Sequence, residues 1–223
     1  MMIVNYSLNE TIIYILYIAK YIYKGVFNTL IYSILSTFFG ILVGGSLAIL
    51  RYSKNKVLVI FIKFYISLIR GIPFLLQLFF IYFALPSILN LHISIFIAGI
   101  LTMSMNSAAY VSEIFRGGIE SVDKGQFEAS ESLSISYFRM MYDIILPQCL
   151  RSIFPSLINE ITNLIKESAV IGVIGVGEIM RRSQIVAAEK YEFITPLCIA
   201  ALLYYTIVYM VTFFGNFIEK KIQ

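Results

Sequence analysis

The chain has 223 residues, of which 59% are hydrophobic and 13% are charged, and its formal net charge is +4. An average soluble domain is about 45–50% apolar and about 25% charged. A globule of this length could not bury such an apolar excess, whereas membrane lipid can accommodate it. The composition therefore predicts an integral membrane protein and excludes a soluble domain. The modest charge lies mostly between apolar stretches and gives no reason to expect nucleic acid as a partner.

Residue types that build metal centres and hydrolytic triads are scarce. His92 is the only histidine, and Cys149 and Cys198 lie far apart with no CxxC pattern. One histidine is too few to build a histidine zinc site, and it leaves a single candidate base for a Ser-His-Asp triad. We expect no catalytic residue and no metal site, and a membrane-embedded enzyme is a weak alternative.

Apolar stretches predict an all-α membrane protein with about five transmembrane helices, each of about 20 mainly apolar residues. Residues 26–50 and 193–218 carry no charged side chain. Residues 71–112 are also free of charge and are long enough for two helices, with a turn expected at residues 86–92. Residues 152–180 are apolar but contain four ionisable side chains.

A shorter apolar stretch precedes these five, at residues 11–23, and two lysines flank its end. Its length favours an amphipathic helix on the membrane surface over a sixth span. We therefore expect an interfacial segment at residues 1–25, a transmembrane domain at 26–218 and a tail at 219–223.

Basic residues predict the orientation, because cytoplasmic loops carry an excess of Lys and Arg. The loop expected at 51–70, the loop at 113–151 and the C-terminus together hold eleven basic residues, against five in the segments on the other side. This distribution predicts an external N-terminus and a cytoplasmic C-terminus. The Arg181–Arg182 pair, placed outside, goes against the trend.

The segment at residues 113–151 is far more polar than the rest of the chain. A structureless loop of this length is uncommon in a compact domain, so we expect short helices, with glycines between them and an amphipathic stretch from Glu128. Such helices need a surface to pack against. That surface is either the membrane domain of the chain itself or a soluble partner.

Residues 125–155 resemble the cytoplasmic EAA loop of the permease subunits of ABC importers. Their sequence is GQFEASESLSISYFRMMYDIILPQCLRSIFP. The residues that match the family pattern are Glu128, Ala129, Leu146 and Pro147. Ser130 replaces the second alanine of the pattern, and Ser134 stands where the family has glycine.

Other segments resemble the subfamily that takes up polar amino acids. They are LIRGIPFLLQ at 68–77, AAYVSEIFRGGI at 108–119, and the pairs Asn159-Glu160 and Lys166-Glu167 with Ser168 after them. Together with the loop, these segments follow one another at compatible spacings from about residue 28 onward. The alternatives are a permease of the same type for another small solute, such as an opine or a sulfur compound, and a five-span channel or receptor.

The resemblance implies the type I ABC importer permease fold, in the cytoplasmic membrane and surrounded by lipid. It implies pairing with a second permease, identical or related, with ABC ATPase subunits that bind the loop, and with an external solute-binding protein. The chain lacks a GxxxxGK[ST] phosphate loop. We therefore expect no cofactor on this chain, with ATP and magnesium bound by the partner ATPase.

The resemblance also assigns residues to ATPase coupling. They are Gly125, Glu128, Ala129, Ser130, Ser134 and Arg116. Glu128 could instead stabilise the N-terminus of a helix, and Arg116 could equally be a positive-inside anchor. Because Ser134 replaces a turn glycine, we expect its hydroxyl to cap the following helix, which would avoid a left-handed backbone conformation.

Polar residues of the fourth span predict a translocation path. Glu160, Asn163 and Glu167 recur at i, i+3 and i+7, on one helix face, and Lys166 lies beside it. Ionisable groups within a span are costly and usually face a cavity or a partner. Carboxylates and an ammonium would complement an amino acid, although a Glu–Lys pair could instead hold helices together. Weaker candidates in the third span are Asn106 and Tyr110.

Overall fold

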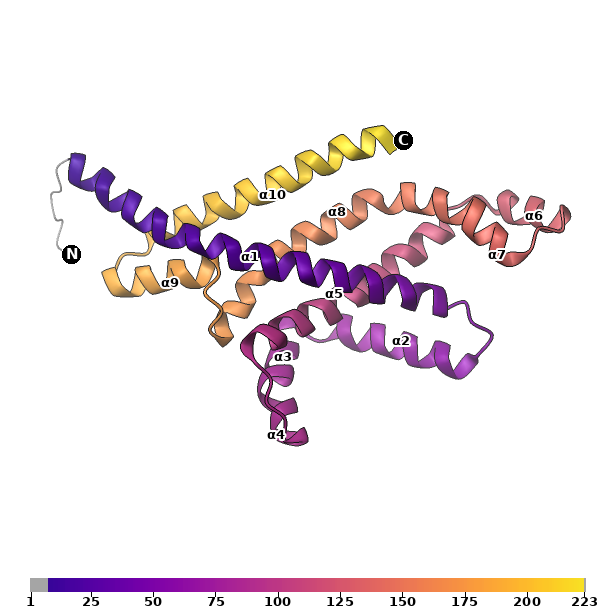
Figure 1. Ribbon diagram of the computed structural model, residues 1–223, viewed down its shortest axis with the longest axis horizontal. Helices are drawn as coiled ribbons and strands as arrows, with labels where there is room; N and C mark the ends of the chain where they lie inside the picture. Colours follow the sequence, from indigo (N-terminus) through magenta and orange to yellow (C-terminus); the bar gives the residue numbers. More distant parts are fainter. Residues whose placement is uncertain (1–7, 223) are drawn as a thin grey trace.

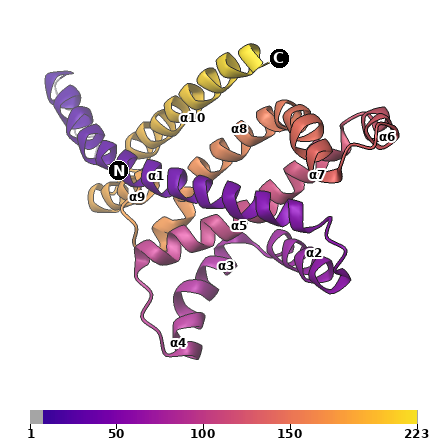
Figure 2. The same cartoon turned by 45° about the vertical axis from the view of Figure 1, so that its right-hand side comes forward.

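The computed structural model describes residues 8–222, and every regular element in that range is a helix (Figure 1). The four longest are α1 (Leu8–Leu50), α5 (Ile95–Glu120), α8 (Leu146–Ile171) and α10 (Ile194–Ile222). Both α1 and α8 pack along α5, and α10 packs against α8 (Figure 2). The predicted all-α fold is confirmed.

The first helix, α1, is longer than one membrane crossing requires. Its 43 residues extend about 65 Å, about twice the thickness of a bilayer hydrocarbon core. The helix has no break near residue 25, where we expected an interfacial segment to end. Residues 1–7 of that segment lie outside the described range, and the placement of the remainder on the membrane surface stays a prediction.

A helix, α2 (Lys56–Gly71), stands where we expected a loop at residues 51–70. Asn55 caps it, because its side-chain oxygen accepts two backbone N–H groups, at 3.1 and 3.3 Å. The three basic residues of α2 recur every seven positions and so lie along one side of the helix. The loop prediction was wrong because a run of charges does not distinguish a loop from an amphipathic helix.

The chain bends by 108° between α2 and the helical segment at residues 74–89. That segment consists of α3 (Phe74–Phe79), the π-helical turn η1 (Phe80–Ala84) and α4 (Leu85–Leu89). Pro73 has no N–H, so it cannot continue the hydrogen bonding of α2. Gln77 compensates, because its Nε2 donates to the carbonyls of Ile69 and Ile72 at 2.8 Å each. The side chain thus satisfies carbonyls that the bend leaves open.

Within residues 8–222, three helices are long and apolar enough to span a membrane, or four if a bent pair counts as one span, whereas the sequence predicted about five. By length and composition, α1, α5 and α10 can each cross a membrane, and α2 with residues 74–89 adds a fourth if the bent pair is one span. The helix α8 has the length of α5, but its four charged side chains leave it outside these candidates. The turn expected at residues 86–92 falls slightly later, where Asn90 adopts a left-handed φ of 55° and Ser94 caps α5.

The fourth span, expected at residues 152–180, begins and ends earlier than predicted. A short 3₁₀ helix, η3 (Gly172–Ile174), follows α8, and Gly175 turns the chain with a φ of 101°. A separate helix, α9 (Ile179–Lys190), comes next. The predicted end was wrong because apolar residues continue through this turn. The fifth span is α10, which runs to Ile222, so residues 219–222 of the expected tail are helical.

Glu178 fixes the start of α9. Its carboxylate accepts hydrogen bonds from the backbone N–H of Met180, at 2.7 Å, and from the Tyr204 hydroxyl of α10, at 2.5 Å. Burial raises the pKa of this carboxyl group. The contact joins α9 to α10 at the end of the molecule opposite the polar segment between α5 and α8 (Figure 1).

Two glycines allow α1 and α5 to approach each other closely. A Cβ atom at Gly40 would lie 2.5 Å from Ser107 Oγ, and one at Gly44 would lie 2.6 Å from the Ala108 carbonyl oxygen. Both distances are too short for any larger residue without movement of a helix. Gly40 and Gly44 therefore form a small-xxx-small contact between the two helices.

Candidate functional site

The polar segment between α5 and α8 folds into short helices, as predicted. They are α6 (Lys124–Ser132), α7 (Tyr137–Arg139) and the π-helical turn η2 (Met140–Ile145). One face of the segment packs against the ends of α5 and α8 through a buried apolar cluster. Its members are Ile119, Val122, Met140, Ile145, Cys149 and Ile153. The segment therefore rests on its own membrane domain, and its other face is available to a partner.

Asp123 and Gly125 shape the start of α6. The Asp123 carboxylate accepts a hydrogen bond from the backbone N–H of Gly125 at 2.6 Å. A Cβ atom at position 125 would lie only 2.8 Å from Asp123 Oδ1. Glycine at this position therefore permits the cap, and a direct role for Gly125 in ATPase coupling stays a prediction.

The three residues Glu128, Ala129 and Ser130 differ in exposure. Glu128 and Ala129 are exposed, whereas Ser130 is buried and its hydroxyl donates to the Gln126 carbonyl at 2.6 Å. Glu128 lies beyond the first turn of α6, where the helix dipole has little effect. Glu128 and Ala129 are therefore free to contact a partner, and Ser130 fixes the helix on which they lie.

Ser134 does not cap the next helix, contrary to our expectation. It adopts a left-handed conformation with a φ of 53°. Its backbone N–H donates to the Glu131 carbonyl at 2.9 Å, and that of Ile135 donates to the Ser130 carbonyl at 3.0 Å. These two bonds form a Schellman motif with Ser134 at the position usually held by glycine. The expectation was wrong because the C-terminal hydrogen bonds of α6 offset the strain at Ser134.

Replacement of Ser134 by glycine is expected to stabilise the end of α6 by about 1 kcal/mol, because glycine has no Cβ to strain in the left-handed region. Ser132→Gly, two residues earlier in helical conformation, is the matched control and should lower the stability of α6 by about 0.5–1 kcal/mol. Hydrogen exchange at the amides of residues 129–135 would measure both effects. Slower exchange in both variants, or faster exchange in both, would contradict the motif.

Apolar side chains are exposed on the outer face of the loop. They are Leu133, Tyr137, Phe138 and Tyr142, and we refer to them as the exposed loop surface. The side chain of Phe138 is 77% exposed, and its ring stacks against that of Tyr142 with centroids 6.2 Å apart. Single exposed apolar residues are ordinary, but a group of large ones on one loop is typical of a binding surface.

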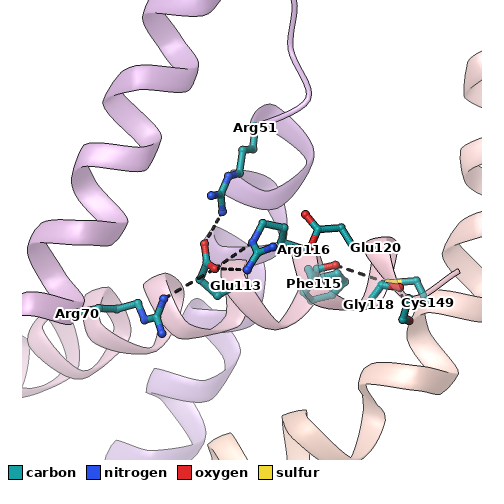
Figure 3. A network of polar contacts seen from close by, with 9 residues as sticks. Arg51, Arg70, Glu113, Phe115, Arg116, Gly118, Glu120 and Cys149 are labelled. Carbon is teal, nitrogen blue, oxygen red and sulfur yellow. Dashed lines mark hydrogen bonds and ion pairs between the residues drawn. The ribbon is translucent and has the colours of Figure 1, made fainter.

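Glu113 lies at the centre of an ion-pair network where α1, α2 and α5 meet (Figure 3). Arg51, at the end of α1, and Arg116, on α5, both donate to its carboxylate, the latter at 2.8 Å. Arg70 of α2 lies 3.8 Å away. Arg116 also pairs with Glu120 at 2.5 Å. The network ties three helices together beside the loop.

This network changes the interpretation of Arg116. Its guanidinium is directed into the junction of helices and is held by two carboxylates (Figure 3). A contact between Arg116 and an ATPase stays a prediction. Glu113 itself was missed, because Arg51 and Arg70 were assigned to one loop and were not expected to converge on α5. The available signal was an acidic residue directly after the charge-free stretch at 71–112 and three positions before an arginine.

Three of the six predicted path residues, Asn106, Glu160 and Glu167, lie where α5 and α8 pack together. Asn106 Nδ2 donates to Glu167 Oε2 at 3.2 Å. This hydrogen bond joins a predicted path residue of α5 to one of α8. Glu160 is buried, with 8% of its surface exposed. The face common to Glu160 and Glu167 therefore points toward α5, as an i, i+7 spacing requires.

The remaining path candidates lie apart from this pair. Asn163 and Lys166 are exposed, so neither is enclosed between α5 and α8. Within residues 8–222 Lys166 forms no ion pair with Glu160 or Glu167, so an intrachain Glu–Lys pair does not hold these helices together. Tyr110 is 37% exposed, with the Arg70 guanidinium 5.3 Å from its ring centroid. It therefore belongs with the Glu113 network.

The sequence of this chain is similar to those of transporter subunits over most of its length. Residues 36–223 match the family described as binding-protein-dependent transport system inner membrane component. A putative glutamine transport system permease protein, GlnP, of Rickettsia typhi is 50% identical over 201 residues, which cover 90% of this chain and 92% of that protein. The arginine transport system permease protein ArtQ of Bacillus subtilis is 41% identical over 203 residues, which cover 91% and 93%.

Solved structures share the fold. A crystal structure of an amino acid ABC transporter with histidines has a TM-score of 0.88 and 31% identity, with 97% of this chain and 99% of that chain covered. An inward-facing MetNI methionine ABC transporter has a TM-score of 0.76 at 20% identity, which shows the fold alone.

Spanning helices with a polar α5–α8 contact and a folded loop define the membrane-spanning subunit of a transporter. The chain belongs to the family of inner membrane components of binding-protein-dependent transport systems. It is a multi-pass permease subunit of an ABC importer.

Proposed function

We propose that this permease carries polar amino acids across the cytoplasmic membrane. The observation that supports the substrate class most strongly is the contact between Asn106 and Glu167, with Glu160 on the same face of α8. Carboxylates and amides within a span are costly unless they serve a path or a partner. Relatives named for glutamine and arginine transport support the same class of solute.

The chemistry of these residues complements the backbone groups of an amino acid. Glu160 and Glu167 can attract its ammonium group, and Lys166 can attract its carboxylate, if a second permease brings the exposed side of α8 to the path. None of these permease residues distinguishes one amino-acid solute from another by its side chain. Uptake of an opine or a sulfur compound, with no response to glutamine or arginine, would favour the alternative solutes.

The chain acts with partners in this proposal and has no catalytic role of its own. ABC ATPase subunits bind ATP and magnesium and contact the exposed loop surface. A second permease, identical or related, completes the path, and an external solute-binding protein delivers the solute. The apolar character of the exposed loop surface supports the ATPase contact, because burial of such side chains favours association.

Glu167→Gln is expected to lower uptake at least about tenfold, because a hydrogen bond that a carboxylate accepts from the solute is worth about 1.5–3 kcal/mol. The amide can still bond to Asn106, so the packing of α5 on α8 should persist. Uptake by proteoliposomes that hold the complete complex, with its binding protein outside, would measure the effect. Glu167→Asp is the conservative control and should retain more uptake than the amide.

A structural role for Glu167 would give a different result. The melting temperature of the complex would then fall in proportion to uptake, and Asp would be no better than Gln. Normal uptake by Glu167→Gln would remove the carboxylate from the path, while ATP-dependent uptake by the complex would still identify the transporter.

The orientation proposed from charge places the α5–α8 loop inside the cell. Single cysteines in place of Ser87 and Ser132, both exposed, would report it in a background with alanine at Cys149 and Cys198. An impermeant thiol reagent applied to intact cells is expected to label position 87 and not position 132. Label at position 132 from outside would reverse the orientation, and permeabilised cells provide the control for reactivity.

A further inference from the structure

A basic depression lies between the turn that joins α1 to α2 and the end of α5. It consists of two adjoining pockets, of about 410 and 270 Å³, that share Arg51 and Tyr52. Lys56 lines the first, and Lys63 and Arg116 line the second together with one carboxylate, that of Glu120. We propose that this depression, the α1–α2 basic pocket, binds the headgroup of an anionic phospholipid.

The pocket has an excess of positive charge. Arg51 and Arg116 are already paired with carboxylates of the Glu113 network. Lys56 and Lys63 are exposed, and neither forms an ion pair with another residue of the described range. Four basic side chains therefore face two carboxylates, and the two lysines remain available to an added anion. Basic pockets between membrane helices bind lipid headgroups by this charge complementarity.

The wall of the pocket on α2 continues into an apolar stripe. Val57, Ile60, Phe61 and Phe64 recur at i, i+3, i+4 and i+7, and their exposed fractions are 62%, 66%, 67% and 63%. Ile60 also lines the pocket. A soluble anion would complement the lysines alone, whereas a phospholipid complements both features. Its phosphate would lie at the lysines and an acyl chain along the stripe.

The position of the pocket suits the membrane boundary. The apolar helix α1 ends at Leu50, and the polar turn at residues 51–55 follows. Lys63 lies about 10 Å along α2 from Lys56, and a long lysine side chain can extend its ammonium toward the headgroup level. The proposal adds a lipid site to the transport function and does not depend on which side of the membrane the turn faces.

Native mass spectrometry of the intact transporter complex would test the proposal. The complex is exchanged into detergent with phosphatidylglycerol or with phosphatidylcholine of the same acyl chains, and retained lipid is counted. Phosphatidylglycerol is expected to be retained in preference. Lys56→Gln combined with Lys63→Gln should weaken its binding about thirtyfold, or roughly fivefold for each lysine removed.

A matched control removes the same charge elsewhere. Lys220→Gln combined with Lys221→Gln changes the end of α10, outside the pocket, and should leave retention of phosphatidylglycerol unchanged. Equal retention of the two lipids, or equal retention of phosphatidylglycerol by the wild type and the Lys56/Lys63 variant, would overturn the proposal. So would lysine-dependent binding of inorganic phosphate without any difference in lipid. Loss of the ATPase from the variant with lipid binding unchanged would assign the lysines to a protein interface and would also overturn it.

Discussion

Gly118→Ala is expected to prevent normal assembly of the permease, although it adds one methyl group. A Cβ atom at this position would lie 2.1 Å from Ile153 Cγ2 and 2.7 Å from Cys149 Sγ. Both atoms belong to short, buried side chains with little room to rotate away, so α5 and α8 would have to separate. Overpacking of this kind typically costs about 1–3 kcal/mol and occasionally more. Melting temperature and yield of the purified permease would measure it.

The adjacent Gly117 is a matched control on the same helix. Apart from its own turn of helix, no atom of residues 8–222 lies within 4 Å of a Cβ atom placed there, so Gly117→Ala should gain about 1 kcal/mol of helix propensity without a clash. Ile153→Ala removes the atom that clashes and should rescue Gly118→Ala in part, which a double-mutant cycle would measure. Similar melting temperatures for the two single alanine variants would show that α5 and α8 do not meet at this position.

Composition and apolar stretches predicted α1, α5 and α10 as spans, because a spanning helix needs only length and low charge. Periodic charge was harder to interpret. We predicted a loop from the charges of Lys56, Lys63 and Arg70, but these residues lie along one side of the helix α2. An apolar run likewise could not show that Gly175 turns the chain between α8 and α9. The ends of helices depend on local hydrogen bonds, about which a hydropathy pattern gives no information.

The candidate site was predictable where spacing within one helix decides the geometry. Glu160 and Glu167 share a face because they are seven residues apart, and that face meets α5. Contacts between distant elements were not predictable in this way. Glu113 pairs with Arg51, at the end of α1, and with Arg70 of α2. The strain at Ser134 is offset by backbone hydrogen bonds, which the identity of the side chains does not reveal.

Phe138→Asp is expected to weaken binding of the partner ATPase about thirtyfold while leaving the permease folded. The Phe138 ring is 77% exposed, so the change removes little packing within the chain. A large aromatic side chain at a protein interface is often worth about 2 kcal/mol or more. Aspartate would also have to bury a charge in that interface. Copurification of the ATPase with the tagged permease, at several ATPase concentrations, would measure the change.

Tyr191→Asp provides a matched control at the other end of the molecule. Tyr191 is 91% exposed and lies just after α9, far from α6 and α7 (Figure 1). Its left-handed φ of 51° is one that aspartate tolerates comparatively well. ATPase binding should therefore match that of the wild type in this variant. Equal loss in both variants would point to general damage, and wild-type binding by Phe138→Asp would remove the exposed loop surface from the ATPase interface.

Because the loop rests on α5 and α8 through a buried cluster, an ATPase bound to its outer face would be coupled directly to the helices that carry Asn106 and Glu167.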